Sequence, residues 1–213
     1  MEVLKIETRR LIENIYILIE GDGAIIIDPG YEFDALVDLI ENRDLKLEKI
    51  LLTHGHGDHI ASCEKLRAKY NTPIYAHEKE KELLLNPNLN LSSTMYGDIS
   101  LEADFYVNED SEAYFNDHKI EFIYTPGHTI GSQCIKIGDY LFTGDTLFRN
   151  SIGRTDLPTS SSEDMKKSLE KIKLLDDDLI VYPGHNSSST IGDEKKYNQF
   201  LIWYFHKNMI IFL

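Results

Sequence analysis

The segment Ile50-Leu51-Leu52-Thr53-His54-Gly55-His56-Gly57-Asp58-His59 places three histidines and an aspartate directly after an apolar run. Imidazole and carboxylate groups are ligands that borderline divalent metals prefer, and chance is a poor explanation for a cluster this dense. The apolar run predicts a buried strand, and the glycines permit a tight turn that re-aims the next side chains. The segment therefore predicts a metal site at the end of a strand.

Three further segments repeat this design of an apolar strand, a turn and a metal-binding side chain. They are residues 120–128 (IEFIYTPGH), 140–145 (YLFTGD) and 179–185 (LIVYPGH). A lone histidine after a strand is more often solvated or paired than a ligand. Four such strand ends can converge on one pocket, because buried strands hold short turns rigidly.

These four segments, in this order, resemble the motif set of the metallo-β-lactamase superfamily. Residues 143–158 (TGDTLFRNSIGRTDLP), followed by 181–185 (VYPGH), resemble the short, single-domain branch related to hydroxyacylglutathione hydrolase, or glyoxalase II. The resemblance covers roughly residues 1–201. It implies an α/β chain with the αββα fold, in which two mixed sheets face each other with helices outside and a dinuclear metal site lies at one edge.

The resemblance also implies which side chains bind the two divalent ions. Three belong to the first metal, three to the second, and one is shared by both: His54, His56 and His128; Asp58, His59 and His185; and Asp145. Zinc is the expected metal, with iron or manganese as alternatives, because these ligands accept each of them. Two divalent ions less the charges of Asp58 and Asp145 leave about +2, which would hold a bridging hydroxide as the nucleophile at neutral pH.

The branch resemblance implies hydrolysis of a small-molecule thioester such as S-lactoylglutathione. A thiolate leaves readily near neutral pH, so the reaction needs little acid beyond Asp58, the expected catalytic side chain. Arg154 stands where glyoxalase II carries a substrate-binding lysine and could hold a substrate carboxylate, although an ion pair with Asp156 is an equal alternative. Asp156 and Ser187 replace two tyrosines of that family, which leaves the thiol carrier open.

Other reactions remain alternatives on the same scaffold. A sulfur dioxygenase would use a single iron held by fewer ligands, and the full set of seven side chains speaks against it. A β-lactamase would not share its metals through an aspartate at the position of Asp145. A metal-free binding protein is disfavoured because loss of function normally lets at least one ligand change.

Composition excludes further classes of function. The chain has 213 residues, and 22 Lys and Arg against 36 Asp and Glu give a net charge of -14, which would repel a nucleic-acid backbone. The N-terminal residues mix charge into every turn, so neither a secretory signal nor a membrane span is expected there, and a cytoplasmic location follows. Cys63 and Cys134 are expected to be reduced and buried.

The remaining pattern predicts one domain over residues 1–201. Strands are expected at 4–8, 15–20, 24–27, 74–76, 120–124, 134–137, 140–143 and 179–182, the first three antiparallel, and helices at 31–42, 61–70, 78–85 and 163–175. Residues 86–117 are expected to form a long loop. The apolar tail, 202–213, is outside the resemblance and could pack as a helix, cover a sheet edge or form a homodimer contact.

Four other potential ligands are assigned supporting roles. Asp28, after the run AIII, is expected to orient the 54–59 loop rather than to bind metal, since seven ligands already fill the site. His77, His118 and His206 are expected to be surface or otherwise satisfied histidines.

Overall fold

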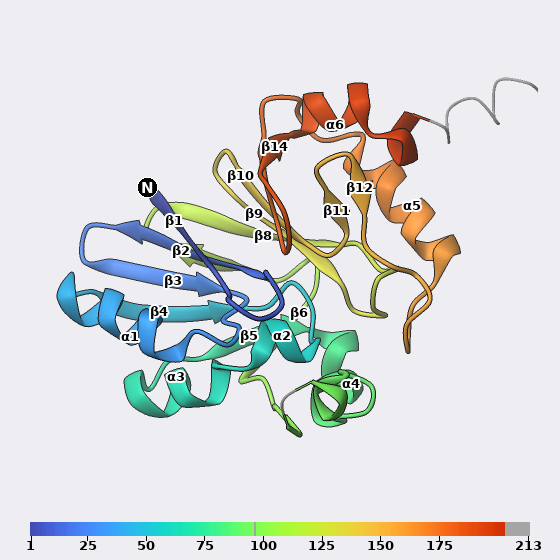
Figure 1. Ribbon diagram of the computed structural model, residues 1–213. Helices are drawn as coiled ribbons and strands as arrows, with labels where there is room; N and C mark the ends of the chain where they lie inside the picture. Colours follow the sequence, from blue (N-terminus) through green and yellow to red (C-terminus); the bar gives the residue numbers. More distant parts are fainter. Residues whose placement is uncertain (96, 203–213) are drawn as a thin grey trace, which may run out of the picture.

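The computed structural model describes residues 1–95 and 97–202, and two six-stranded mixed sheets pack face to face between outer helices (Figure 1). The first sheet has the order β1(Glu2–Glu7), β2(Asn14–Glu20), β3(Gly23–Ile27), β4(Lys46–Leu51), β5(Ile74–His77), β6(Phe105–Val107). The second has the order β14(Ser189–Thr190), β13(Ile180–Pro183), β10(Tyr140–Gly144), β9(Gln133–Ile137), β8(His118–Tyr124), β7(Ala113–Phe115). A short hairpin joins β11(Leu147–Phe148) and β12(Ser151–Ile152). The expected αββα architecture is confirmed.

Both faces of the central strands are buried, and the side chains of β2 show how. Ile15 and Ile17 point toward the helical layer, whereas Tyr16 and Leu18 point between the sheets. The period of two along a strand sends alternate side chains to opposite faces. Residues 15–19 of β2 form a continuous hydrophobic run rather than an alternating one, which fits only a layer covered on both sides.

Helices cover the outer face of each sheet. On the first sheet, α1(Phe33–Asn42) buries Leu36 and α3(Cys63–Tyr70) buries Leu66. On the second, α5(Ser162–Ile172) buries Leu169 and α6(Ile191–Tyr197) buries Ile191. The shorter helices are α2(Gly57–Ile60), η1(Glu78–Glu80), α4(Lys81–Leu85) and η2(Ser92–Thr94). Asn71 ends α3 in the left-handed conformation, which asparagine tolerates at a helix C-terminus.

The prediction of one long loop over residues 86–117 is wrong in part. Its residues include η2 and the strands β6 and β7, which complete one edge of each sheet. These strands have only three residues each, FYV and AYF, too few to show a periodic pattern. They form because neighbouring strands supply hydrogen-bond partners, which local sequence does not reveal. The predicted helix over 78–85 is divided into η1 and α4.

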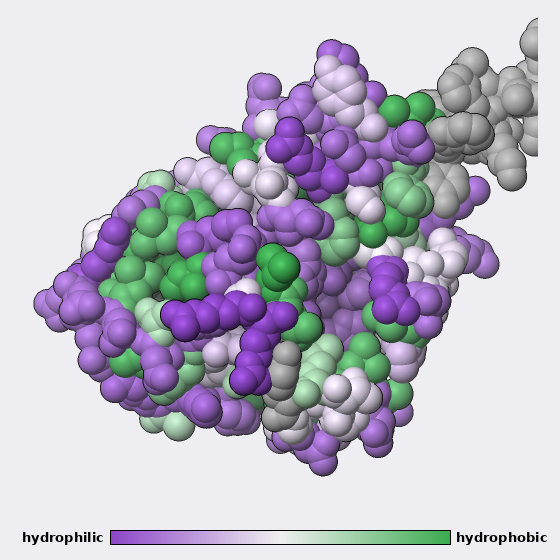
Figure 2. Space-filling model, in the orientation of Figure 1, coloured by the Kyte–Doolittle hydropathy of each residue, from purple (hydrophilic) through white to green (hydrophobic). Residues whose placement is uncertain are grey.

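The exposed surface is mostly polar. Polar side chains cover most of the face seen in Figure 2, with apolar patches between them. None of the described helices has both the length and the apolar character needed to cross a membrane. The predicted apolar tail comprises residues 202–213, and all of these except Ile202 lie outside the described residues.

Phe115 offers a direct test of the packing between the sheets, because its neighbour in β7 points the other way. Phe115 is fully buried in the inter-sheet core, whereas Tyr114 is 49% exposed. Phe115→Ala should lower the free energy of unfolding by about 3 kcal/mol or more, measured by urea denaturation. Tyr114→Ala should change it by less than about 1 kcal/mol. Equal effects of the two substitutions would contradict the inward orientation of Phe115 and the outward orientation of Tyr114 in β7.

Candidate metal centre

Four strand ends meet at one edge of the two sheets and carry the predicted side chains. β4 of the first sheet leads into residues 54–59, and β8, β10 and β13 of the second lead into His128, Asp145 and His185. The structure thus brings together side chains that are far apart in the sequence. The candidate site belongs to the boundary between the sheets rather than to either one.

Three histidines form the first half of the site. The ligand atoms of His54, His56 and His128 lie within 4.8 Å of one another, and all three residues are buried. His56 Nδ1 is 3.0 Å from His128 Nε2, and the rings meet edge to face. This three-histidine cluster could hold one divalent ion.

The second half contains a carboxylate and two histidines. The ligand atoms of Asp58, His59 and His185 also lie within 4.8 Å of one another. Asp58 Oδ2 is 3.8 Å from His59 Nε2 and 3.5 Å from His185 Nε2. The side chain of His185 is 22% exposed whereas that of His59 is fully buried, so this aspartate cluster reaches solvent on the His185 side.

Asp145 faces both halves at once. Its Oδ2 atom is 3.5 Å from His128 Nε2 in the three-histidine cluster and 3.6 Å from His185 Nε2 in the aspartate cluster. Its Oδ1 atom is 3.6 Å from His59 Nε2. A carboxylate with one oxygen between two groups of imidazole nitrogens is suitably placed to be shared by two ions.

Unpartnered polar atoms show that the residues fit a metal. Among the described residues, His54 Nε2, His59 Nε2 and Asp145 Oδ1 are buried without a hydrogen-bond partner. Leaving such an atom unsatisfied costs about 1–3 kcal/mol, so buried polar atoms normally have a partner. These atoms belong to the groups that bind zinc, iron or manganese, and coordination would satisfy them. The donor set therefore fits two divalent cations.

Burial keeps two of the imidazoles neutral, which is the form that binds a metal. Burial, reinforced by the charge of His128, lowers the pKa of His56 to about 3. Burial and the neighbouring histidines also place the pKa of His54 well below its ordinary value. For His59, burial acts in the same direction, but Asp58 and the other nearby carboxylates outweigh it and raise the pKa.

Hydrogen bonds to the second nitrogen of the imidazole orient three of the rings. His128 Nδ1 lies 2.9 Å from the Arg154 carbonyl oxygen, and His185 Nδ1 lies 3.0 Å from that of Ile12. His59 Nδ1 lies 3.0 Å from Asp28 Oδ2. Such partners fix the tautomer and leave Nε2 directed at the metal position.

Asp28 connects this orientation to the backbone of the 54–59 loop. Its Oδ1 atom accepts a hydrogen bond of 2.7 Å from the Thr53 amide, and its Oδ2 atom accepts one from the Thr53 hydroxyl. The predicted orienting role of Asp28 agrees with these contacts.

Comparison with known proteins identifies the family. Residues 8–185 match the family described as the metallo-beta-lactamase superfamily. The chain belongs to this superfamily. It is 38% identical over 190 residues to hydroxyacylglutathione hydrolase GloC of Haemophilus influenzae, covering 84% of this chain and 87% of that protein.

Two solved structures of the superfamily have similar backbones. The crystal structure of the BLEG-1 B3 metallo-beta-lactamase is 34% identical with a TM-score of 0.89, covering 94% of this chain and all of the other. TTHA1623, solved in a di-iron-bound form, is 30% identical with a TM-score of 0.85, covering 93% of this chain and all of the other. The superfamily, the fold and a His/Asp metal-binding site typical of a metallo-hydrolase are therefore established.

Two side chains of β2 support the metal site, a role that the sequence did not predict. Asn14 Nδ2 donates to the carbonyl oxygens of Pro183 and Asn186 at 3.0 and 2.8 Å, and the Tyr16 hydroxyl donates to Pro183 at 2.8 Å. These bonds hold the turn that carries His185. The signal in the sequence is that Asn14 and the Tyr16 hydroxyl are polar groups at the start of a strand whose residues 15–19 are otherwise apolar.

Glu13 is a second residue that the sequence analysis missed. It is fully buried, and both of its carboxylate oxygens have no hydrogen-bond partner among the described residues. Burial raises its pKa well above the ordinary value, opposed by His59 and reinforced by Asp28 and Asp58. Its backbone pairs with that of His185.

Arg154 and the other side chains singled out in the sequence belong to neither cluster. Arg154 Nε and Nη2 donate to the two carboxylate oxygens of Asp156 at 2.9 and 3.0 Å, in an exposed ion pair. His77 is buried and its Nδ1 accepts from the Lys79 amide, while His118 lies 3.3 Å from Glu20, so both are satisfied as predicted. His206 lies outside the described residues. Both cysteines are free and buried, as expected.

Gly184 gives a test of how tightly the two halves of the site are packed. A methyl group at this position would overlap Asp145 Oδ1 and lie 2.7 Å from His59 Cε1. Gly184→Ala should therefore reduce the bound metal of the purified protein by at least half, measured by elemental analysis. Gly192→Ala, whose methyl group meets exposed Asp177 at 3.2 Å, is the control and should keep its metal. Full metal content in Gly184→Ala would show that the close packing of position 184 against Asp145 and His59 is not needed for metal binding.

Proposed function

We propose that this protein is a two-metal hydrolase of small hydroxyacyl thioesters, with S-lactoylglutathione as the representative substrate. The observation that carries the proposal is the position of Asp145, which faces imidazole nitrogens of both clusters. The proposed ligands are the seven side chains described above, with zinc as the metal and iron as an alternative that the di-iron form of TTHA1623 supports. The proposed partner is a small molecule, without nucleic acid or membrane.

The chain's own groups suit acyl transfer to water. When bound, two divalent cations supply a water of lowered pKa and an electrophile for the carbonyl oxygen. The side chain of Asp58 is 12% exposed and lies beside His185 on the side that reaches solvent. We assign to its carboxylate the removal of the proton from the attacking water; this proton then passes to solvent, and the sulfur leaves as a thiolate. The buried imidazoles of the three-histidine cluster exclude bulk water from the other side.

The leaving group favours a thioester over an amide or a simple ester. A thiolate is stable near neutral pH, so cleavage of the C–S bond needs little protonation, whereas an amine must be protonated as it leaves. A site whose one proposed proton-transfer group is Asp58 is therefore better suited to a thioester. The similarity to GloC, a hydroxyacylglutathione hydrolase, supports the same substrate class.

A substrate panel tests the proposal. The metal-loaded protein should hydrolyse S-lactoylglutathione or another hydroxyacyl thioester faster than a chromogenic β-lactam, and it should consume no O₂ with glutathione persulfide. The β-lactam is included because BLEG-1 is described as a B3 metallo-beta-lactamase. Oxygen uptake without thioester cleavage would establish a mononuclear iron sulfur dioxygenase instead. Preferential β-lactam cleavage would likewise overturn the proposal.

Substitution of the shared carboxylate should affect both metals. Asp145→Ala should lower metal content and thioester hydrolysis together, with kcat/KM reduced on the order of 100-fold or more, because both clusters lose a ligand. Elemental analysis and steady-state kinetics measure the two quantities. Asp139→Ala, in the exposed turn before β10, is the matched control. An Asp145→Ala protein with one metal and full activity would contradict the two-metal proposal.

Arg154 allows a test of whether the protein binds a substrate carboxylate remote from the thioester bond. If its guanidinium holds a substrate carboxylate, Arg154→Ala should raise KM several-fold for a carboxylate-bearing thioester and leave kcat and metal content unchanged. The carbonyl oxygen that contacts His128 belongs to the backbone and is retained. A neutral thioester of the same acyl group should show no change in KM. Equal penalties on both substrates, with lower thermal stability, would assign Arg154 to the ion pair with Asp156 alone.

A further inference from the structure

Glu80 is a buried carboxylate that joins the two loops of the three-histidine cluster. It lies in η1, outside the four strand-end segments, and is only 1% exposed. Its Oε2 atom accepts a hydrogen bond of 2.8 Å from the Gly55 amide. Its Oε1 atom accepts bonds of 2.6 Å from the Gly131 amide and 2.6 Å from the Thr129 hydroxyl. One carboxylate therefore accepts three hydrogen bonds from two separate loops.

These donors are immediate neighbours of the histidines. Gly55 lies between His54 and His56, and Thr129 follows His128. The His56 and His128 rings belong to loops 72 positions apart in the chain, yet their facing nitrogens are 3.0 Å apart. Glu80 thus bridges the two loops from which all three imidazoles project.

Close approach of the carboxylate depends on glycine in both loops. A Cβ atom at position 55 would lie 2.9 Å from Glu80 Oε2, and one at position 131 would lie 2.7 Å from Glu80 Oε1. A side chain at either position would push the carboxylate away from its donors. The glycines and the buried acid therefore form one fitted arrangement rather than an incidental contact.

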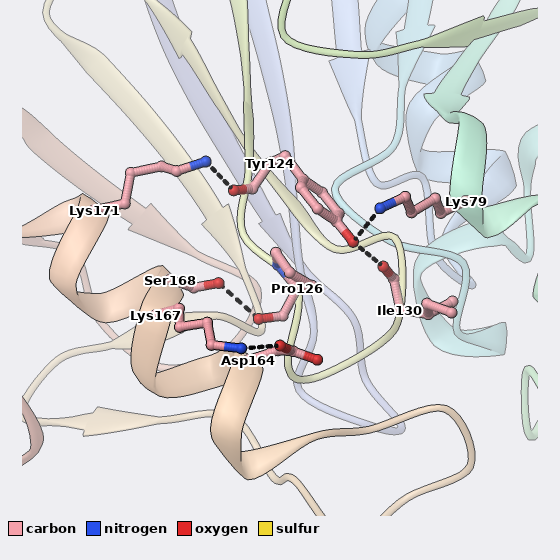
Figure 3. A pocket seen from close by; sticks show the side chains of 8 residues that line it. All are labelled: Lys79, Tyr124, Pro126, Ile130, Asp164, Lys167, Ser168 and Lys171. Atoms are coloured by element: carbon pink, nitrogen blue, oxygen red, sulfur yellow. Dashed lines mark hydrogen bonds and ion pairs between the residues drawn. The ribbon is translucent and has the colours of Figure 1, made fainter.

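The second loop, residues 129–131, has a further contact besides those with Glu80. The Tyr124 hydroxyl donates to the Ile130 carbonyl oxygen at 2.9 Å and accepts from Lys79 Nζ at 3.1 Å (Figure 3). These residues line an open pocket of about 540 Å³ between η1 and α5. Because this anchoring remains when Glu80 is changed, we expect the loop to shift relative to the 54–56 segment rather than to unfold.

The aspartate cluster has different orienting groups. His59 is held by Asp28, and His185 by the carbonyl oxygen of Ile12. The hydrogen bonds that Glu80 accepts come from Gly55, Thr129 and Gly131 and involve none of these residues. A change at Glu80 should therefore act on one half of the site and spare the other.

We propose that Glu80 is a positioning residue that sets the spacing of the three-histidine cluster and so determines the affinity of that cluster for its metal. The proposal rests on the metal-binding part of the proposed function and is independent of the substrate. A carboxylate is required because each of its two oxygens faces a backbone N–H, that of Gly55 or that of Gly131, which can only donate. An amide would turn its own NH₂ group toward one of these N–H groups and leave that N–H without an acceptor.

Glu80→Gln tests this role, with Glu82→Gln on the exposed side of α4 as the matched control. Competition with a chromophoric zinc chelator measures the two dissociation constants of each protein. In Glu80→Gln one constant should rise about 10–100-fold, as is typical when a partner of a metal ligand is removed, and the other should keep its wild-type value. Side-chain ¹⁵N signals of labelled histidines should identify His54, His56 and His128 as the affected set. Glu82→Gln should match wild type.

Two outcomes overturn the proposal: unchanged affinities in Glu80→Gln, or equal weakening of both ions. If Glu80→Gln does not fold, Glu80→Asp decides, because its carboxylate is one methylene too short to reach both loops. Selective weakening of the same ion supports the proposal, and wild-type affinity for both ions contradicts it. A wild-type protein that binds only one ion would instead contradict the two-metal function, so the two failures are distinguishable.

Discussion

Asp145 must face two clusters of metal-binding side chains at once, and the packing of the two sheets meets this requirement. The three-histidine cluster takes two side chains from the first sheet and one from the second, and the aspartate cluster is divided in the same way. Neither sheet alone holds either cluster. The apolar layer of Tyr16, Leu18, Phe115 and Phe142 between the sheets therefore sets the geometry of the polar site at its edge.

Two buried carboxylates, Asp28 and Glu80, have similar supporting roles behind this site. Asp28 accepts hydrogen bonds from Thr53 and contacts His59, while Glu80 accepts from Gly55, Thr129 and Gly131. Each holds loop backbone that carries metal-binding side chains, and neither is in the set of seven. A buried acid tolerates such a place because several N–H and O–H donors surround its oxygens. The rigidity of the site thus depends on groups one layer behind the proposed ligands.

The metal-binding side chains could be predicted from the sequence more completely than the edge strands of the two sheets. The ligand-type side chains follow apolar strands and turns, so chemistry and periodicity point to the same residues, and the structure brings all seven together. The strands β6 and β7 were missed because three residues show no period and their pairing partners are distant in the chain. Glu80 and Glu13 were missed for a related reason. A glutamate in a charged segment is ordinarily solvated, and only the folded arrangement shows that these two are buried.

Anomalous X-ray scattering from crystals of the zinc-loaded protein can show whether the Asp145 carboxylate is shared by two metals. We expect two anomalous peaks per chain. One should lie among His54, His56 and His128 and the other among Asp58, His59 and His185, with the Asp145 carboxylate between them. A single peak per chain at full zinc loading, or two peaks without contact to Asp145, would contradict this expectation.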